Sequence, residues 1–339
     1  MSAGVLILTG QTASGKSALA LELAERFGAE IVGADSRQIY RGMPVGTAAP
    51  SEADGARVPH HLVGFLDPRE RYSAARFVAD ALAAIDAIHA RGRRALVVGG
   101  TGFYVRALTG DVALSPAYDA SLRERLAREA RIHPPEALAQ WLHALAPQRA
   151  TAIAPNDPYR ITRALEIALA ERSGSGLRDS RSRAQSDDNT MAYPDGAITA
   201  AAETASVSAG DGNVSIAAMN LRTRGVPYAK LHLDIDPDTL QRRIESRVDA
   251  MLANGLLDEA ERVGADAVAA DAVGYREALA FLAGWSTRDE LRAQLVRNTR
   301  RYAKRQATWF RTEPGLVRVD AAGAAARAVA LAGALPGWA

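Results

Sequence analysis

Short apolar runs, each closed by a glycine or a polar residue, recur along the chain between amphipathic stretches. The runs are Val5 to Gly10, Ile31 to Asp35, Ala95 to Gly100, Leu231 to Ile235 and Leu316 to Val319. Nearly continuous apolar runs of this length are typical of parallel strands that are covered on both faces. The pattern therefore predicts an α/β fold with one parallel sheet flanked by helices.

Apolar residues recur with helical spacing between the predicted strands. The clearest stretches are Ser17 to Phe27, Phe77 to Ala90, Leu240 to Leu257 and a basic stretch from Arg288 to Arg311. Residues 119–171 hold only helical patterns punctuated by prolines. We therefore predict an inserted all-helical subdomain in that part of the chain.

Residues 173–227 differ in composition, because they are rich in Ser, Ala, Gly, Asp and Thr and poor in large apolar residues. Such a segment buries too little apolar surface to offset its ordering entropy. We predict a low-complexity, disordered insertion whose deletion from 176 to 224 leaves the reaction rate unchanged. The predicted domains are a catalytic core at 1–113 and 228–339, a helical subdomain at 114–172 and this insertion at 173–227.

The first predicted strand ends in a phosphate-binding loop. Residues 10–17 read GQTASGKS, which matches G-x-x-x-x-G-K-[ST] between a strand and a helix. Backbone N–H groups of such a loop bind phosphate oxygens, Lys16 adds a positive charge, and the Ser17 hydroxyl suits Mg²⁺. We assign the whole motif to a di- or triphosphate: Gly10, Gln11, Thr12, Ala13, Ser14, Gly15, Lys16 and Ser17.

Two further polar residues follow predicted strands. Asp35 closes the second strand, and Thr101 follows the third within Gly-Gly-Thr-Gly. The carboxyl ends of strands line the ligand crevice of an open α/β sheet, so both side chains are expected near Lys16. Asp35 suits a general base or an outer ligand of Mg²⁺, and both residues also suit a turn or a helix cap.

Composition and charge limit the classes of protein that remain. The chain has no cysteine, which excludes disulfides and thiolate metal sites. No apolar run approaches the roughly 20 residues that span a bilayer, so we expect a cytoplasmic monomer with no membrane partner. The net charge is only +2, yet residues 288–311 carry eight basic and two acidic side chains. A near-neutral total is therefore compatible with a polyanionic partner on a local basic face.

An ordered series of motifs resembles the tRNA dimethylallyltransferases (tRNA isopentenyltransferases) of bacterial type. Besides residues 10–17, they are DSRQIYRGM at 35–43, VVGGTGFY at 97–104, NDPYRITRALE at 156–166, VGYRE at 273–277 and TRRYAKRQATWF at 299–310. The resemblance implies transfer of a dimethylallyl group from dimethylallyl diphosphate to N6 of the adenosine 3′ of the tRNA anticodon. It also implies a P-loop NTPase-like core that holds Mg²⁺ and the diphosphate of the allylic substrate.

The resemblance also implies roles for single residues. Asp35 would take the N6 proton, Thr101 would contact the diphosphate or position the base, and Arg243 would add phosphate contacts. The target adenine would be flipped out of the anticodon loop into a pocket. Contacts with the anticodon stem-loop would come from Asp35, Ser36, Arg37, Gln38, Thr101, Arg123, Tyr159, Arg160, Ile161, Thr162, Arg163, Gly274, Tyr275 and Arg276.

The departure from the family at position 11 and three alternatives bear on this interpretation. Gln11 stands where proline is usual, which predicts a looser loop backbone. A small-molecule kinase or ATPase, a non-catalytic RNA-binding protein, or a transferase that acts on free adenine nucleotide would also use the loop. The helical insertion and the basic stretch at 288–311 favour tRNA over a free nucleotide.

Overall fold

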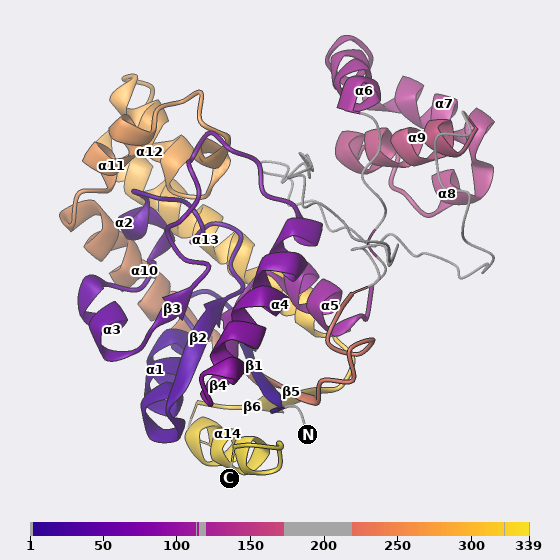
Figure 1. Cartoon of the computed structure of the whole chain (residues 1–339). Helices are drawn as coiled ribbons and strands as arrows, with labels where there is room; N and C mark the ends of the chain where they lie inside the picture. Colours follow the sequence, from indigo (N-terminus) through magenta and orange to yellow (C-terminus); the bar gives the residue numbers. More distant parts are fainter. Residues whose placement is uncertain (1–2, 113, 115–119, 173–218, 322, 339) are drawn as a thin grey trace.

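Six parallel strands form one sheet in the computed structural model, which describes residues 3–112, 114, 120–172, 219–321 and 323–338. The strand order is β3-β2-β4-β1-β5-β6 (Figure 1). Their bounds are β1 (Val5–Gly10), β2 (Ala29–Gly33), β3 (His60–His61), β4 (Arg94–Gly99), β5 (Tyr228–Leu233) and β6 (Leu316–Val319). Leu6 of β1 pairs with Leu96 of β4 on one side and with Ala229 of β5 on the other. The predicted parallel α/β sheet is confirmed.

Side chains of β1 alternate between two hydrophobic layers. Leu6 and Leu8 pack with α1 (Lys16–Phe27) and α14 (Ala324–Gly333). Val5 and Ile7 pack into the larger layer, with α4 (Ala74–Ala90) and α5 (Gly102–Thr109). Alternation follows from the pleat, which points successive side chains to opposite faces. Both faces of the sheet are therefore covered, as the apolar runs predict.

The larger layer continues into the helices that follow β5. These are α10 (Pro237–Ala253), α11 (Leu256–Val263), the 3-10 turn η2 (Val268–Asp271), α12 (Tyr275–Leu282) and α13 (Arg288–Phe310). The single helix predicted for Leu240 to Leu257 is in fact two helices. Gly255 has a φ of 91°, a left-handed conformation that ends α10 and lets α11 start in a new direction. Two short helices, α2 (Pro44–Thr47) and α3 (Glu52–Arg57), follow β2.

A separate group of helices confirms the predicted all-helical subdomain, and Figure 1 shows it apart from the sheet. It consists of α6 (Ala120–Ile132), α7 (Pro135–Leu145), α8 (Pro147–Thr151) and α9 (Pro158–Arg172). Leu126, Leu138, Leu142 and Leu165 form a small core of its own. None of the helices described by the structure has both the length and the apolar character needed to span a bilayer.

The end of the low-complexity segment packs on the α/β core. Residues 173–218 lie outside the described residues, whereas residues 219–227 are described. Leu221 is fully buried and its N–H donates to the Leu108 carbonyl at 2.8 Å. Arg224 pairs with Asp86 of α4 at 2.8 Å. The prediction that disorder extends to residue 227 is therefore wrong, because one buried leucine and one ion pair anchor this stretch.

Candidate active site

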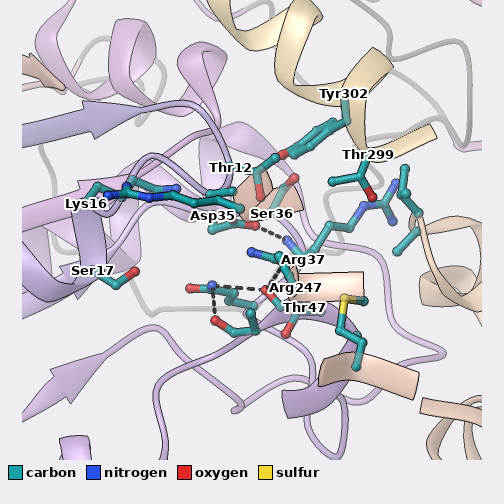
Figure 2. A pocket seen from close by; sticks show the side chains of 18 of the residues that line it. Thr12, Lys16, Ser17, Asp35, Ser36, Arg37, Thr47, Arg247, Thr299 and Tyr302 are labelled. Carbon is teal, nitrogen blue, oxygen red and sulfur yellow. Dashed lines mark hydrogen bonds between the residues drawn. The ribbon is translucent and has the colours of Figure 1, made fainter. Parts of the chain in front are cut away.

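A cavity of about 560 Å³ opens at the carboxyl ends of β1 and β2. Its wall is built by the phosphate-binding loop, the loop between β2 and α2, and residues of α10 and α13 (Figure 2). Lys16 and Asp35, which come from different strand ends, both line it. Lys16 and Asp35 thus converge on one crevice as predicted, whereas Thr101 is not among the residues that line it.

The phosphate-binding loop has the backbone shape that its sequence predicts. Gly15 has a φ of 99° and starts α1, and Ala13 also adopts a left-handed φ of 62°. The φ of Gly15 is one that residues with a side chain rarely adopt, and a Cβ there would lie 3.0 Å from Arg243 Nη1. Arg243 Nη1 donates to the Ser14 carbonyl at 2.7 Å, which places this predicted site residue against the loop.

Helix α13 holds the loop from the other side. Gln306 accepts a hydrogen bond from the Thr12 N–H at 2.7 Å and donates to the Gly100 carbonyl at 3.0 Å. The Gln11 side-chain amide donates to the Ala303 carbonyl at 3.0 Å. The glutamine at position 11, which predicts a looser loop, therefore attaches the loop to α13 instead.

The Lys16 ammonium is affected by two charged neighbours, Asp35 and Arg247. Its ammonium donates to the Gln11 carbonyl at 3.3 Å. Burial lowers the pKa of Lys16 to about 8, the negative charge of Asp35 partly opposes that shift, and the positive charge of Arg247 adds to it. An anion in the cavity would favour the charged form of Lys16, so ligand binding and its protonation are linked.

The Ser17 hydroxyl and the Asp35 carboxylate are oxygen donors of the kind that Mg²⁺ takes beside the oxygens of a diphosphate. Ser17 is exposed at the first turn of α1, and its hydroxyl and the Asp35 carboxylate belong to the same cavity wall. No group of three His, Asp or Glu side chains suited to a metal occurs within the described residues. Mg²⁺ typically keeps several waters and takes few protein ligands beside substrate phosphates, so this sparse set is sufficient.

Asp35 lies beyond the end of β2, in a turn that fixes its carboxylate. One carboxylate oxygen accepts a hydrogen bond from the Arg37 N–H at 2.9 Å (Figure 2). Thr101 is 2% exposed, outside the cavity wall, and its hydroxyl accepts from the Ser36 N–H at 3.0 Å. The predicted contact of Thr101 with the diphosphate is not supported by this placement. The hydrogen bond to the Ser36 N–H fits the other predicted role of Thr101, which is to position the loop that carries Asp35.

Arg247 is a cavity residue that the sequence prediction missed. It lies one turn after Arg243 on α10, and its guanidinium donates to the Thr47 carbonyl at 3.2 Å. The Gln38 side chain donates to the same carbonyl at 3.2 Å and to the Ala48 carbonyl at 2.9 Å (Figure 2). Burial lowers the pKa of Arg247. The i, i+4 spacing from Arg243 was the signal that could have identified it.

Positive charge dominates the wall of the cavity. Five cationic side chains line it: Lys16, Arg37, Arg243, Arg247 and Arg305. Among the described residues that line it, Asp35 is the one carboxylate. The apolar part of the wall includes Met251 and Val273, and Tyr302 contributes an aromatic ring. Such a wall suits a polyanionic ligand whose reacting group approaches Asp35.

The predicted RNA contacts on α6 and α9 form a compact charged cluster. Arg123 and Arg163 both bind the buried Glu166 carboxylate, at 2.8 Å and 2.6 Å. Tyr159 and Thr162 line the same small pocket as these two arginines, and Arg160 pairs with Asp157 at 3.5 Å. Ile161 is 1% exposed and its side chain packs in the core of the subdomain, so its contact with RNA stays a prediction.

Of the three RNA contacts predicted at the start of α12, two residues are buried and one is exposed. Gly274, with a φ of 109°, and Tyr275 are buried. The Tyr275 hydroxyl donates to Glu259 at 2.6 Å, its oxygen lies 3.1 Å from the Met43 carbonyl oxygen, and its ring lies against Gly46. The Tyr275 side chain therefore supports the loop that lines the cavity, and its contact with RNA stays a prediction. Arg276 is exposed.

Known proteins match this chain over nearly its whole length. The family model IPP transferase matches residues 38–313, and the model Isopentenyl transferase matches residues 3–58. The tRNA dimethylallyltransferase of Geobacter metallireducens is 40% identical over 324 residues, which are 93% of this chain and 92% of the relative. That of Thiobacillus denitrificans is 42% identical over 324 residues, 93% of this chain and 91% of the relative.

Solved structures agree with the sequence comparisons. The full-length tRNA isopentenylpyrophosphate transferase of Bacillus halodurans is 33% identical with a TM-score of 0.60, over 94% of this chain and 89% of that one. A eukaryotic dimethylallyltransferase acting on tRNA has a TM-score of 0.68 at 22% identity, over 97% of this chain and 77% of that one, and shows the fold alone. Because one family model covers most of the chain and relatives at 40% identity match nearly all of it, the chain belongs to the IPP transferase family.

Proposed function

We propose that this protein transfers the dimethylallyl group from dimethylallyl diphosphate to N6 of the adenosine 3′ of the anticodon in tRNA. Relatives that match nearly the whole chain are tRNA dimethylallyltransferases. The observation that carries the proposal is the shared cavity of the phosphate-binding loop and Asp35. A donor diphosphate and an acceptor amine would meet there.

The loop side of the cavity supports departure of the diphosphate. Negative charge grows on this group as the carbon–oxygen bond breaks, so fixed positive groups stabilise the transition state more than the ground state. Backbone N–H groups of the loop, Lys16 and Arg243 are the groups that supply this charge. Bound Mg²⁺, held by Ser17 and diphosphate oxygens, would add Lewis-acid stabilisation to the leaving group.

The Asp35 side of the cavity supports activation of the acceptor. The N6 lone pair forms the new carbon–nitrogen bond, the bond from carbon to diphosphate breaks, and the N6 proton passes to the Asp35 carboxylate. The Arg37 N–H holds that carboxylate at 2.9 Å, and Thr101 fixes the adjacent Ser36 backbone. An adenine stacked in an RNA loop must leave its stack to bring N6 into the cavity beside Asp35, so we include base flipping in the proposal.

Transfer of label from the donor to RNA tests the proposal. The protein is incubated with Mg²⁺, dimethylallyl diphosphate labelled in the prenyl group, and unmodified tRNA, with AMP or ATP added in parallel. We expect label in tRNA, none in the nucleotides, and loss of transfer after chelation with EDTA. Label in AMP would favour a nucleotide acceptor, and ATP hydrolysis without labelled RNA would favour a kinase or ATPase.

A further inference from the structure

A network of five charged side chains joins α5, β5 and the chain that follows α13. Lys230 of β5 lies at its centre and donates to Asp111 at 2.7 Å and to Glu313 at 2.6 Å. These three side chains are at most 6% exposed. Arg106 pairs with Glu313 at 2.9 Å, and Arg222 pairs with Asp111. Breaking a buried ion pair leaves an unpaired charge, so this network, called here the Lys230 network, holds its members in one arrangement.

Arg106 connects the Lys230 network to the last turn of α13. Its Nη2 donates to the Thr312 carbonyl at 2.9 Å, and its guanidinium carbon lies 4.5 Å from the centre of the Trp309 ring. A Cβ at Gly102 would lie 2.0 Å from this ring, so the ring touches the Gly102 backbone. The Trp309 indole N–H has no hydrogen-bond partner within the described parts of the chain. The ring is therefore held in place by packing and by Arg106.

The residue next to Gly102 holds the backbone on both sides of Asp35. Thr101 precedes Gly102, and its N–H donates to the Ala34 carbonyl at 3.2 Å. The Thr101 hydroxyl accepts from the Ser36 N–H at 3.0 Å. Ala34 and Ser36 are the two neighbours of Asp35 in the chain. A displacement of Gly102 would therefore carry Asp35 with it.

We propose that Arg106, anchored by the Lys230 network, is a positioning residue that holds Trp309 against Gly102 and thereby fixes the place of Asp35 in the cavity. This inference rests on the proposed function, in which Asp35 is the base. A base must lie within hydrogen-bond distance of the proton that it takes, so a small displacement of Asp35 slows the reaction. Arg106 is not among the described residues that line the cavity, so its loss should lower the rate and leave substrate binding unchanged.

The test compares two arginines that each pair with a buried carboxylate. Arg106→Gln removes the guanidinium and leaves Glu313 paired with Lys230. The control, Arg91→Gln, removes the arginine partner of the buried Glu30. Urea unfolding gives the stability of each variant. Single-turnover prenyl transfer and the affinities for tRNA and inorganic diphosphate are then measured at a temperature at which both variants are folded.

For Arg106→Gln we expect the single-turnover rate at saturating tRNA and donor to fall about 10- to 100-fold, the effect of misplacing a reacting group by about 1 Å. Both affinities should be unchanged, and Arg91→Gln should match the wild type. If Arg106→Gln does not fold, Arg106→Lys replaces it, because lysine keeps the charge beside Glu313 and loses the planar group over Trp309. A wild-type rate in the folded variant, or a loss confined to substrate affinity, would overturn the proposal.

A double-mutant cycle with Asp35→Asn separates positioning from a general effect on the fold. If Arg106 acts through Asp35, adding Arg106→Gln to Asp35→Asn should slow transfer no further, because the base is already absent. Losses that multiply in the double variant would show that Arg106 acts independently of Asp35, and would overturn the proposal while leaving the proposed function intact. Failure of the wild type to label tRNA would reject the proposed function itself.

Discussion

The Gln306 side-chain carbonyl accepts a hydrogen bond of 2.7 Å from the backbone N–H of Thr12. This contact joins α13 to the phosphate-binding loop across 294 residues of chain. The amide end of the same side chain donates to Gly100, where a Cβ would lie only 2.2 Å from it. One buried glutamine therefore sets the positions of two loops at the ends of adjacent strands β1 and β4.

Replacing Gln306 with alanine should disturb both loops. The Thr12 N–H and the Gly100 carbonyl would be left without partners in a buried place, which costs about 1–3 kcal/mol each in folding free energy. We expect lower stability in denaturant unfolding and a raised KM for dimethylallyl diphosphate. Gln294→Ala on the same helix is the control. Equal stability and KM for the two variants would contradict this role of Gln306.

Tyr275→Phe should affect stability and leave tRNA affinity unchanged. The variant loses the 2.6 Å hydrogen bond to the buried Glu259 carboxylate, which also accepts from the Val45 and Gly46 N–H groups. We expect a loss of about 1–3 kcal/mol, measured by urea unfolding. Weaker tRNA binding at unchanged stability would show instead that Tyr275 contacts RNA.

Lys16 should make diphosphate binding dependent on pH. Its pKa of about 8 means that the ammonium loses its proton as the pH rises from 7 to 9. Because the charged form binds the anion, affinity for inorganic diphosphate should fall by up to about tenfold over that range. Lys16→Arg keeps its charge and should show a flatter profile, measured by calorimetry. Parallel profiles for the two proteins would contradict the assignment.

Deletions should separate the two parts of the low-complexity segment. Removal of 176–224 takes away buried Leu221 and the ion pair of Arg224 with Asp86. We expect that deletion to lower stability by about 2–5 kcal/mol, the usual cost of losing a buried leucine. Removal of 176–216 should leave stability and prenyl transfer near wild type. A large loss of activity in the shorter deletion, with the fold intact, would assign a role to the segment.

The sequence predicts every strand of the sheet except the edge strand β3. Apolar runs bounded by glycine or polar residues locate β1 and β6 with their correct bounds. The edge strand β3 consists of His60 and His61, whose pairing with β2 depends on tertiary contacts and leaves no apolar pattern. Apolar residues keep helical spacing on both sides of Gly255, so their spacing alone does not reveal the break between α10 and α11.

In the candidate site too, the sequence predicts the residues that belong to motifs at strand ends and misses those whose position depends on helix packing. The phosphate-binding loop and Asp35 follow from strand ends and a contiguous motif, and the structure places them in one cavity. Arg247 was missed because the face of α10 that meets the loop is set by packing. The prediction that Ile161 and Tyr275 contact RNA came from motifs that span several consecutive residues. A motif does not show which of its side chains face the solvent, because that depends on which face of the helix is buried.

Single-turnover prenyl transfer by Asp35→Asn tests the central claim most directly. Asparagine keeps the shape of Asp35 and an acceptor for the Arg37 N–H, and it removes the base. With labelled donor and saturating tRNA, we predict a rate about 10² to 10⁴ times lower than wild type, with affinity for inorganic diphosphate retained. A wild-type rate in the variant, or a loss explained by weaker diphosphate binding alone, would contradict the role of Asp35 as the base.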